Sequence, residues 1–313
     1  MKLFSLPFAA ALVSVTWACS SDTNTTASSG ASVQAELVRH TVTSDGHPIA
    51  VWEKSAPDAE AVIVLLHGRT WSALPDFDLQ VPGENLSLMD GLVAAGYSTF
   101  GPDMRGYGST PRDATGWLTP DRAARDLAAV LQWVWEKSGG GERPVLLGWS
   151  LGSMISQLTV QRHPELVSQL VLFGYPFDPT VEISRQDHPD KPPRLRNTAK
   201  AAASDFITPG SISQTAIGSY VAAALAADSI RVDWNDWESW AELKAEALTV
   251  PTLLLQGQFD PLAKSEGQVA LFTGLGTPDK EWIVIPGGDH AAFLETPRPH
   301  FIAALVSFIE RHR

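Results

Sequence analysis

Short runs of apolar residues recur along the chain, and each is bounded by glycine, proline or polar positions. Uninterrupted runs of this length are typical of strands that are covered on both faces of a sheet. They predict buried strands at 61–66, 97–102, 144–148, 169–173, 252–255 and 282–285. Two earlier segments, 37–43 and 49–53, mix apolar and polar positions around the turn signal Asp45-Gly46. They therefore predict an antiparallel pair with one exposed face.

Apolar residues with helical spacing occupy several of the intervals between these runs. They predict helices at 85–95, 120–137, 153–163 and 301–311. Strands that alternate with helices indicate an α/β fold, with a mostly parallel central sheet and helices on both of its faces. This core would comprise 37–175 and 250–313. The alternation stops at 176–249, a stretch rich in Ala, Asp and Trp that we interpret as a helical cap inserted into the core.

The first residues follow a different pattern. Lys2 precedes the apolar run 3–15, which is too short to span a membrane as a stable helix and is typical of a signal peptide over 1–18. Residues 19–36 are mostly small and polar, as expected of a flexible tether. The sequence therefore predicts an exported protein, either periplasmic or secreted.

Cys19 is the only cysteine of the chain, so no disulfide forms within it. Its place at the end of the signal segment resembles the acylated cysteine of bacterial lipoproteins. Ala18 fits that pattern, whereas Thr16 and Trp17 fit it poorly. We expect a membrane tether through lipidated Cys19, with ordinary cleavage and release as the alternative.

The charge of the chain bears on its partners. It has 23 Lys and Arg against 35 Asp and Glu, a formal net charge of −12, and no basic cluster stands out. An acidic surface repels phosphate backbones, so nucleic acid is not an expected partner. The sequence contains neither a His-Glu-x-x-His segment nor a cysteine pair, and Gly106-Tyr-Gly108 lacks the third glycine of a dinucleotide fingerprint. No metal and no cofactor is expected, and the oligomeric state is not readable.

The strongest chemical signal is Gly148-Trp-Ser-Leu-Gly152, which directly follows one buried strand and directly precedes one helix. A serine on so sharp a turn needs neighbours without side-chain bulk. The turn lifts its hydroxyl above the sheet, close to a helix N-terminus whose partial positive charge favours an oxyanion. Ser150 is therefore the predicted nucleophile.

A serine nucleophile needs a base, and histidine suits neutral pH. Of the eight histidines, His290 follows the last strand in a glycine-rich loop, at the edge where parallel sheets place their sites. Asp260, after the strand 252–255, is the expected orienting carboxylate, and Asp178 is the alternative. With Asp260 the chain order is Ser, Asp, His, the order expected of this strand–turn–helix arrangement.

Two backbone N–H groups are the predicted oxyanion donors. One belongs to Leu151, directly after the nucleophile, and the other to Arg69, in the loop after the strand that ends at Leu66. The Arg69 side chain either contacts a substrate carbonyl or carboxylate or is solvated.

Tryptophans are the candidate substrate-binding residues, namely Trp71, Trp234 and Trp237. The last two, with Trp240, are spaced by three, roughly along one side of a helix. They would line an apolar acyl or alcohol pocket. The alternative is that they pack the cap onto the core.

Together these segments resemble the α/β-hydrolase superfamily over residues 37 to 313, the cap excepted. The resemblance rests on His67-Gly68, Asp103-Met-Arg-Gly-Tyr-Gly108, Gly148-Trp-Ser-Leu-Gly152, Gly257-Gln-Phe-Asp260 and Gly288-Asp-His290. It implies that Asp103 and Arg105 brace the site without taking part in the chemistry.

Two departures narrow the chemistry that the resemblance implies. Haloalkane dehalogenases and epoxide hydrolases carry Asp where this chain has Ser150, and they usually have Pro where it has Thr70. The first hypothesis is therefore a carboxylic-ester hydrolase, lactones included, that acts on a small-molecule ester through an acyl-serine. The alternatives are an aminopeptidase or amidase of the same fold and a ligand-binding protein with little turnover.

Overall fold

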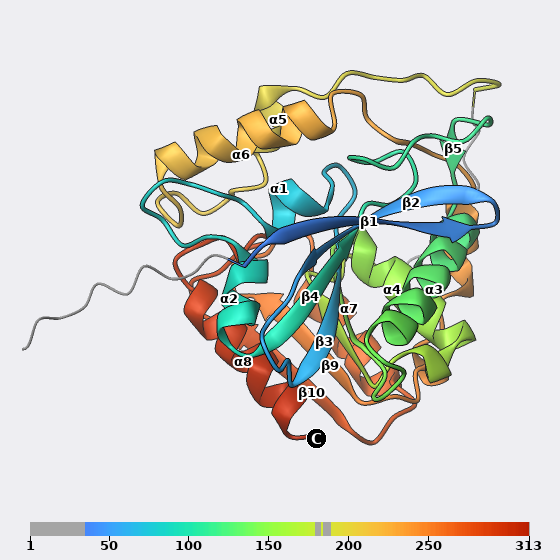
Figure 1. The fold of residues 1–313 in the computed structure, drawn as a ribbon, viewed down its shortest axis with the longest axis vertical. Helices are drawn as coiled ribbons and strands as arrows, with labels where there is room; N and C mark the ends of the chain where they lie inside the picture. Colours follow the sequence, from blue (N-terminus) through green and yellow to red (C-terminus); the bar gives the residue numbers. More distant parts are fainter. Residues whose placement is uncertain (1–34, 179–182, 184–188, 313) are drawn as a thin grey trace, which may run out of the picture. The chain divides into compact units, whose positions relative to one another are not determined.

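The computed structural model describes residues 35–178, 183 and 189–312, so the predicted signal peptide and Cys19 lie outside the described part of the chain. An eight-stranded sheet runs through this part in the order β1-β2-β4-β3-β6-β7-β9-β10 (Figure 1). The pairs β1–β2 and β2–β4 are antiparallel, and all the other neighbours are parallel. The predicted α/β fold with a mostly parallel sheet is confirmed.

Most strands lie where the apolar runs predict them. β1 (Leu37–Ser44) and β2 (His47–Lys54) are joined by Asp45 and Gly46 at φ values of 47° and 74°. A tight hairpin turn requires positive φ at both central residues, which is why an Asp-Gly pair marks it in the sequence. The remaining strands of the sheet are β3 Ala61–Leu66, β4 Tyr97–Pro102, β6 Val145–Trp149, β7 Gln169–Phe173, β9 Thr252–Gly257 and β10 Lys280–Ile285.

Helices cover both faces of the sheet (Figure 1). One face carries α3, α4 and α7, and the other carries α2 and α8. Their bounds are α2 Leu88–Ala94, α3 Pro120–Lys137, α4 Leu151–Arg162, α7 Ser265–Gly274 and α8 Arg298–Glu310. The short helix α1 (Ala73–Phe77) and α7 do not follow from the apolar pattern of the sequence. No helix in the described residues combines the length and the apolar character needed to cross a membrane.

The side chains of the buried strands alternate between two apolar cores. Along β3, Val64 and Leu66 belong to the core under α3 and α4, whereas Ile63 and Leu65 belong to the core under α2 and α8. Each of these side chains is at most 1 % exposed. Full burial of an aliphatic side chain is worth about 1.5–3 kcal/mol, so both cores hold the strand firmly and fix the position of its C-terminal end.

Residues 189–249 lie between β7 and β9 and add no strand to the eight-stranded sheet. They contain α5 (Ala199–Ala203) and α6 (Gln214–Ala227), which pack on each other, and α6 also packs on α1 (Figure 1). The two-residue strand β8 (Asp233–Trp234) pairs with β5 (Trp117–Leu118). Two 3-10 helices follow, η2 Trp237–Glu242 and η3 Ala245–Ala247.

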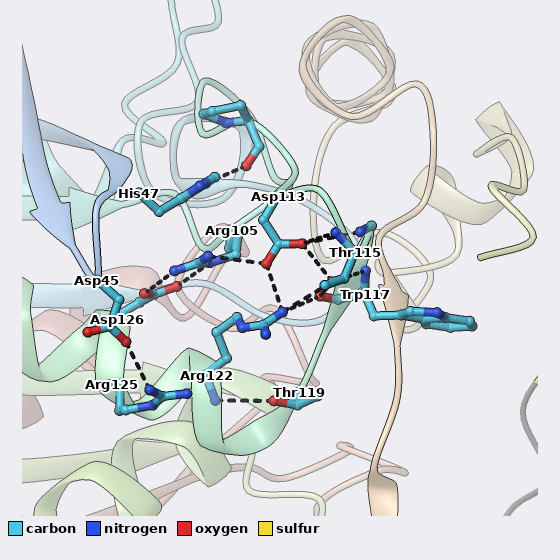
Figure 2. Close-up of polar contacts among 12 residues, drawn as sticks. Asp45, His47, Arg105, Asp113, Thr115, Trp117, Thr119, Arg122, Arg125 and Asp126 are labelled. Atoms are coloured by element: carbon cyan, nitrogen blue, oxygen red, sulfur yellow. Dashed lines mark hydrogen bonds and ion pairs between the residues drawn. The ribbon is translucent and has the colours of Figure 1, made fainter. Parts of the chain in front are cut away.

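A network of charged side chains fixes the loop between β4 and α3 (Figure 2). Arg105 donates to Asp126 from Nε at 2.9 Å and from Nη2 at 2.8 Å, and it also contacts Asp113. Arg122 of α3 donates to the same Asp113 carboxylate at 2.7 Å. Burial opposes the charge of Arg105, but the hydrogen bond and the charge of Asp126 outweigh it and raise the pKa of the guanidinium. A bidentate pair of this kind sets geometry as well as charge, so the loop has one defined path.

Asp103, at the start of the same loop, joins it to the segment after β3. Its carboxylate accepts hydrogen bonds from Ala73 N at 3.0 Å and Ser109 N at 2.9 Å. Burial raises its pKa to about 6, although these bonds favour the ionised form. Asp103 therefore links two loops at the same edge of the sheet.

Candidate active site

Ser150 lies on a sharp turn between β6 and α4, with φ 54° and ψ −123°. Such a backbone costs a serine about 1–3 kcal/mol and is retained only where its surroundings impose it. The flanking glycines allow the close packing that holds it here. A Cβ at Gly148 would come within 2.5 Å of Gly152 O, and a Cβ at Gly152 would come within 2.5 Å of Leu66 O. The Ser150 N–H donates to Phe173 O of β7 at 2.9 Å, which anchors the turn to the next strand.

His290 and Asp260 meet at the C-terminal ends of β10 and β9. His290 Nδ1 lies 2.8 Å from Asp260 Oδ2, and both side chains are at most 5 % exposed. Asp260 Oδ1 accepts from the N–H groups of Leu262 and Ala263 at 2.8 and 3.1 Å. Because backbone donors hold one carboxylate oxygen, the other is fixed in direction and orients the imidazole.

Further contacts fix the His290 loop against the elbow. The indole of Trp149 donates to His290 O at 2.7 Å. Gly174, at φ 58°, allows the close approach, since a Cβ there would lie 3.0 Å from His290 Cε1. Of the two carboxylates that the sequence offers, the one hydrogen-bonded to the imidazole is Asp260, whereas Asp178 lies elsewhere on the cavity wall.

A cavity of about 580 Å³ brings Ser150 and His290 together, since both line it. The hydrogen bonds of the described residues include none from the Ser150 hydroxyl to the imidazole. Such a bond often forms only when substrate is bound. The wall of the cavity is largely apolar and aromatic. Its lining residues of this kind are Trp71, Trp149, Leu151, Met154, Phe177, Ile183, Trp237, Trp240 and Leu262.

The two residues predicted to supply oxyanion donors, Leu151 and Arg69, both line the cavity. Leu151 is the first residue of α4, where backbone N–H groups have no partner within the helix. The Arg69 backbone is held in place, because its carbonyl accepts a hydrogen bond from the hydroxyl of buried Tyr107. The structure thus places both residues beside Ser150.

His67, just before this loop, is a structural residue. Its Nε2 accepts from Met104 N at 2.9 Å, so Nδ1 carries the proton and donates to Gly68 O at 2.9 Å. Burial lowers its pKa to about 4, and the ring is therefore neutral at physiological pH. It ties the Gly68 loop to the loop after β4.

The tryptophans divide into two groups. Trp71 and Trp237 line the cavity, as does Trp240. Trp234 is not among the lining residues, because its indole is buried and donates to Tyr107 at 2.9 Å. The three rings of 234, 237 and 240 nevertheless cluster, with centroids 5.9–6.3 Å apart. The indole N–H of Trp234 already donates to Tyr107, which in turn holds the Arg69 carbonyl. Trp234 therefore supports the Arg69 loop and the tryptophan cluster without lining the cavity.

The Arg69 side chain packs over the ring of Trp237, with Cζ 4.7 Å from the ring centroid. Burial lowers the pKa of its guanidinium, and repulsion from Arg231 adds to this effect. Arg69 lines the cavity and is at the same time exposed to solvent.

An acidic group on the cavity wall has no counterpart in the sequence analysis. Asp76 of α1 and Asp205, just after α5, both line the cavity. Tyr220 of α6 connects them, with its hydroxyl 2.8 Å from Asp76 Oδ1 and 3.3 Å from Asp205 Oδ2. Trp71 Nε1 donates to the same Asp205 oxygen at 2.7 Å. No motif marks these residues, since they come from separate segments that only the fold brings together.

A second carboxyl pair, Asp289 and Glu295, connects the His290 loop to the segment after α5. Asp289 Oδ2 accepts from the N–H groups of Ile207 and Thr208 at 3.0 and 2.6 Å. Glu295 accepts from Ser211 Oγ at 2.7 Å and from Asp289 N at 3.0 Å. Burial raises the pKa of Glu295 to about 7. Asp289 thus ties the His290 loop to the segment after α5.

The described part of the chain contains no set of side chains suited to bind a metal ion. No group of three histidine, cysteine or carboxylate side chains there is arranged to hold a metal ion.

Solved structures share this fold at low sequence identity. A thermophilic esterase from Thermogutta terrifontis is 20 % identical with a TM-score of 0.59, over 89 % of this chain and 99 % of that one. A proline iminopeptidase from Mycobacterium smegmatis is 20 % identical with a TM-score of 0.62, over 88 % and 98 %. Epoxide hydrolase A from Mycobacterium thermoresistibile is 18 % identical with a TM-score of 0.65, also over 88 % and 98 %.

Sequence comparison gives the family. No protein of curated function matches the sequence. The model of the family described as serine aminopeptidase, S33, matches residues 57–297, well over half of the chain. The chain therefore belongs to this family of α/β-hydrolases and is a hydrolase.

Proposed function

We propose that the chain is a serine hydrolase that cleaves carboxylic esters, lactones included, through an acyl-serine intermediate. Ser150 is the nucleophile, His290 the general base and Asp260 the residue that orients the base. The observation that carries this proposal is the 2.8 Å contact of His290 Nδ1 with Asp260 Oδ2 at the cavity that Ser150 lines from its strained turn.

The proposed reaction has two halves. His290 Nε2 takes the Ser150 proton as Oγ attacks the ester carbonyl, and the N–H groups of Leu151 and Arg69 bind the oxyanion that forms. The imidazolium then gives its proton to the departing alcohol, which leaves an acyl-serine. Water, deprotonated by the same imidazole, attacks the acyl-serine and releases the carboxylic acid and free Ser150.

An acyl-serine route suits the residues better than attack by a carboxylate. The elbow position carries a hydroxyl, whereas the Asp260 carboxylate holds His290 and the Asp205 carboxylate accepts from Trp71. The largely apolar lining favours an organic acyl or alcohol group over a strongly hydrated one. Trp71, Trp237 and Trp240 are the side chains that we propose to contact it.

Residues 176–249 are proposed to act as a cap over this cavity. Two sets of contacts support the proposal among the described residues. Trp237 and Asp205 of this segment line the cavity together with Ser150. Asp289, beside the proposed base, accepts backbone hydrogen bonds from Ile207 and Thr208.

Export is a separate proposal, and it rests on sequence alone. We propose that residues 1–18 are a signal peptide and that lipidated Cys19 tethers the protein to a membrane. Mass spectrometry of the mature N-terminus from membrane and soluble fractions tests this. An unprocessed Met1 in all fractions would refute export, and a free thiol on Cys19 would refute lipidation.

A fluorophosphonate probe tests the nucleophile. The folded protein should label at Ser150, as located by mass spectrometry of the modified peptide, and the heat-denatured protein should not. Labelling at another serine, or none, would overturn the proposal. A panel of p-nitrophenyl esters and aminoacyl p-nitroanilides then separates esterase from aminopeptidase activity, and faster turnover of the anilides would replace the ester assignment.

A further inference from the structure

We propose that the guanidinium of Arg69 binds a carboxylate of the substrate, on the cavity wall that it forms with Trp237 and Trp240. The preferred substrate is then an ester that carries a second, free carboxylate, such as a half-ester of a dicarboxylic acid. This inference rests on the proposed ester hydrolysis and names the class of ester that the cavity selects.

The Arg69 guanidinium is a cation without a charge partner. It lines the cavity and packs over Trp237, with Cζ 4.7 Å from the ring centroid. Among the described residues, no carboxylate forms an ion pair with it. Burial lowers the pKa of the guanidinium, repulsion from Arg231 adds to this effect, and no carboxylate there opposes it. A bound anion would supply the missing negative charge.

Arg231 adds a second positive charge close to the first. The two guanidinium groups lie near enough to repel each other, and the buried Nε of Arg231 has no hydrogen-bond partner among the described residues. Arg112 differs, since its Nη1 lies 3.6 Å from the Asp233 carboxylate. The chain as a whole has a formal net charge of −12, so two adjacent arginines without a carboxylate are a local exception. Their field favours an anion at this side of the cavity.

Trp240 provides an independent sign of a missing acceptor on the same wall. Its side chain is 1 % exposed and lines the cavity, yet its Nε1 has no hydrogen-bond partner among the described residues. Its ring centroid lies 6.3 Å from that of Trp237, the ring under Arg69. Leaving a buried donor unpaired is costly, so an acceptor is expected here. An oxygen atom of the substrate can supply it.

The other charged residues of the wall do not neutralise Arg69. His290 is held by Asp260 at 2.8 Å and has its own charge partner. None of the carboxyls that line the cavity acts on the pKa of Arg69; these carboxyls are Asp76, Asp178 and Asp205. Arg69 is therefore the cation on the described part of the wall that is open to an anionic ligand.

The two functional groups of Arg69 indicate the length of the substrate. Its backbone N–H is the proposed oxyanion donor, whereas its guanidinium lies at the far end of the side chain, over Trp237. The ester carbonyl and the second carboxylate should therefore be separated by several carbons. The planar fork of a guanidinium matches a carboxylate through two parallel hydrogen bonds, which favours this group over a neutral amide of the same shape.

The inference is tested with mono-p-nitrophenyl esters of glutaric, adipic and pimelic acid. Each is compared with the ester of the same length that ends in a primary amide, after subtraction of spontaneous hydrolysis. The best half-ester should exceed its amide about tenfold or more in kcat/KM, as expected of a charge-assisted hydrogen bond. Equal or faster turnover of the amide at every length overturns the subsite.

Two variants locate the effect. Arg69→Met removes the guanidinium but keeps the backbone N–H, so most of the preference for the carboxylate should disappear. Arg143→Met is the matched control, because Arg143 packs over Trp135 with Cζ 3.8 Å from the ring centroid and neither residue lines the cavity. This control should keep the preference. Its retention in Arg69→Met would overturn the assignment, and if that variant fails to fold, the wild-type comparison of half-ester with amide still decides.

Calorimetry on Ser150→Ala separates this inference from the proposed function. The ligands are the monoethyl ester of adipic acid and the matching ester that ends in a primary amide. Tighter binding of the carboxylate, without turnover of any ester by the wild-type protein, would refute the esterase proposal and keep the subsite. Ester turnover by the wild-type protein without any preference for the carboxylate would do the reverse.

Discussion

The two walls of the cavity differ in how the chain builds them. The wall that carries Ser150, His290 and Asp260 consists of loops at the C-terminal ends of β6, β10 and β9, so a parallel sheet places them together. The second group, Asp76, Asp205 and Tyr220, comes from α1, the residues just after α5, and α6, which no sheet aligns. The first wall is a consequence of topology, and the second depends on packing between helices.

The two walls therefore differ in what holds their residues in place. Residues at strand ends are held by two apolar cores, so their positions follow from the sheet. The residues on α1 and α6 are placed by contacts between helices, such as the hydrogen bond from Tyr220 to Asp76. Substitutions in each wall test this division.

Replacing Ser150 by Ala should remove the activity that depends on the first wall and leave the structure of that wall unchanged. We expect ester turnover to fall by a factor of at least about 10³, because no other nucleophile lies on the elbow. The side chain carries little packing volume, so the free energy of unfolding should change by less than about 1 kcal/mol. Initial rates and urea unfolding measure the two. Retention of a tenth of the wild-type rate would remove Ser150 from its role.

Replacing Gly152 by Ala should instead distort the structure of the same wall. The new Cβ would meet the backbone oxygen of Leu66 at 2.5 Å, and backbone at both sides leaves little room to adjust. We expect a loss of about 1–3 kcal/mol in the free energy of unfolding, with a parallel loss of turnover. Gly141→Ala is the matched control, since nothing lies within 4 Å of its Cβ position. Equal stability of the two variants would show that the elbow tolerates bulk.

These two walls also mark how far the sequence could predict the structure. The bounds of β3, β4, β7 and α3 follow from apolar runs and helical periodicity, because burial alone determines them. α4 begins at Leu151, two residues before its predicted start. Its residues 151–160 are all buried, so there is little amphipathic contrast to mark the boundary.

The residues of the second wall lie in segments without an apolar run or a helical period that would predict their position. α1 has five residues, which is too short for a periodic pattern. Asp76 and Tyr220 are polar residues that are buried by partners far away in the sequence. The placement of Trp234 behind Tyr107 depends on the pairing of two two-residue strands. Contacts of this kind are decided by tertiary packing, which a single sequence does not encode locally.

Glu295→Gln tests the connection between the walls through its pH dependence. The pKa of Glu295 rises from 4.5 to about 7 on folding, so the folded state binds this proton more tightly than the unfolded state. Wild-type stability should therefore decline as pH rises from 4.5 to 7, by at most about 3 kcal/mol at 1.36 kcal/mol per pH unit. Glutamine does not titrate, so the stability of the variant relative to the wild type should rise over this window.

Urea unfolding at several pH values measures that difference. Glu142→Gln, at an exposed loop position, controls for the removal of one carboxylate. A stability difference that stays constant between pH 4.5 and 7 would show that folding does not raise the pKa of Glu295.

The smallest effects should come from the cluster of Trp234, Trp237 and Trp240. We expect substitution of one member to lower stability and substitution of another to lower activity. Trp234→Phe removes the donor to the buried Tyr107 hydroxyl, so we expect a loss of about 0.5–1.5 kcal/mol in the free energy of unfolding. Trp237→Phe keeps an aromatic ring under Arg69 but reduces its area on the cavity wall, so kcat/KM should fall about two- to fivefold with stability nearly unchanged. Because the two rings lie 5.9 Å apart, repacking of the cluster would make the two variants behave alike. Distinct outcomes would instead show that one tryptophan supports the wall while its neighbour forms the surface that substrate meets.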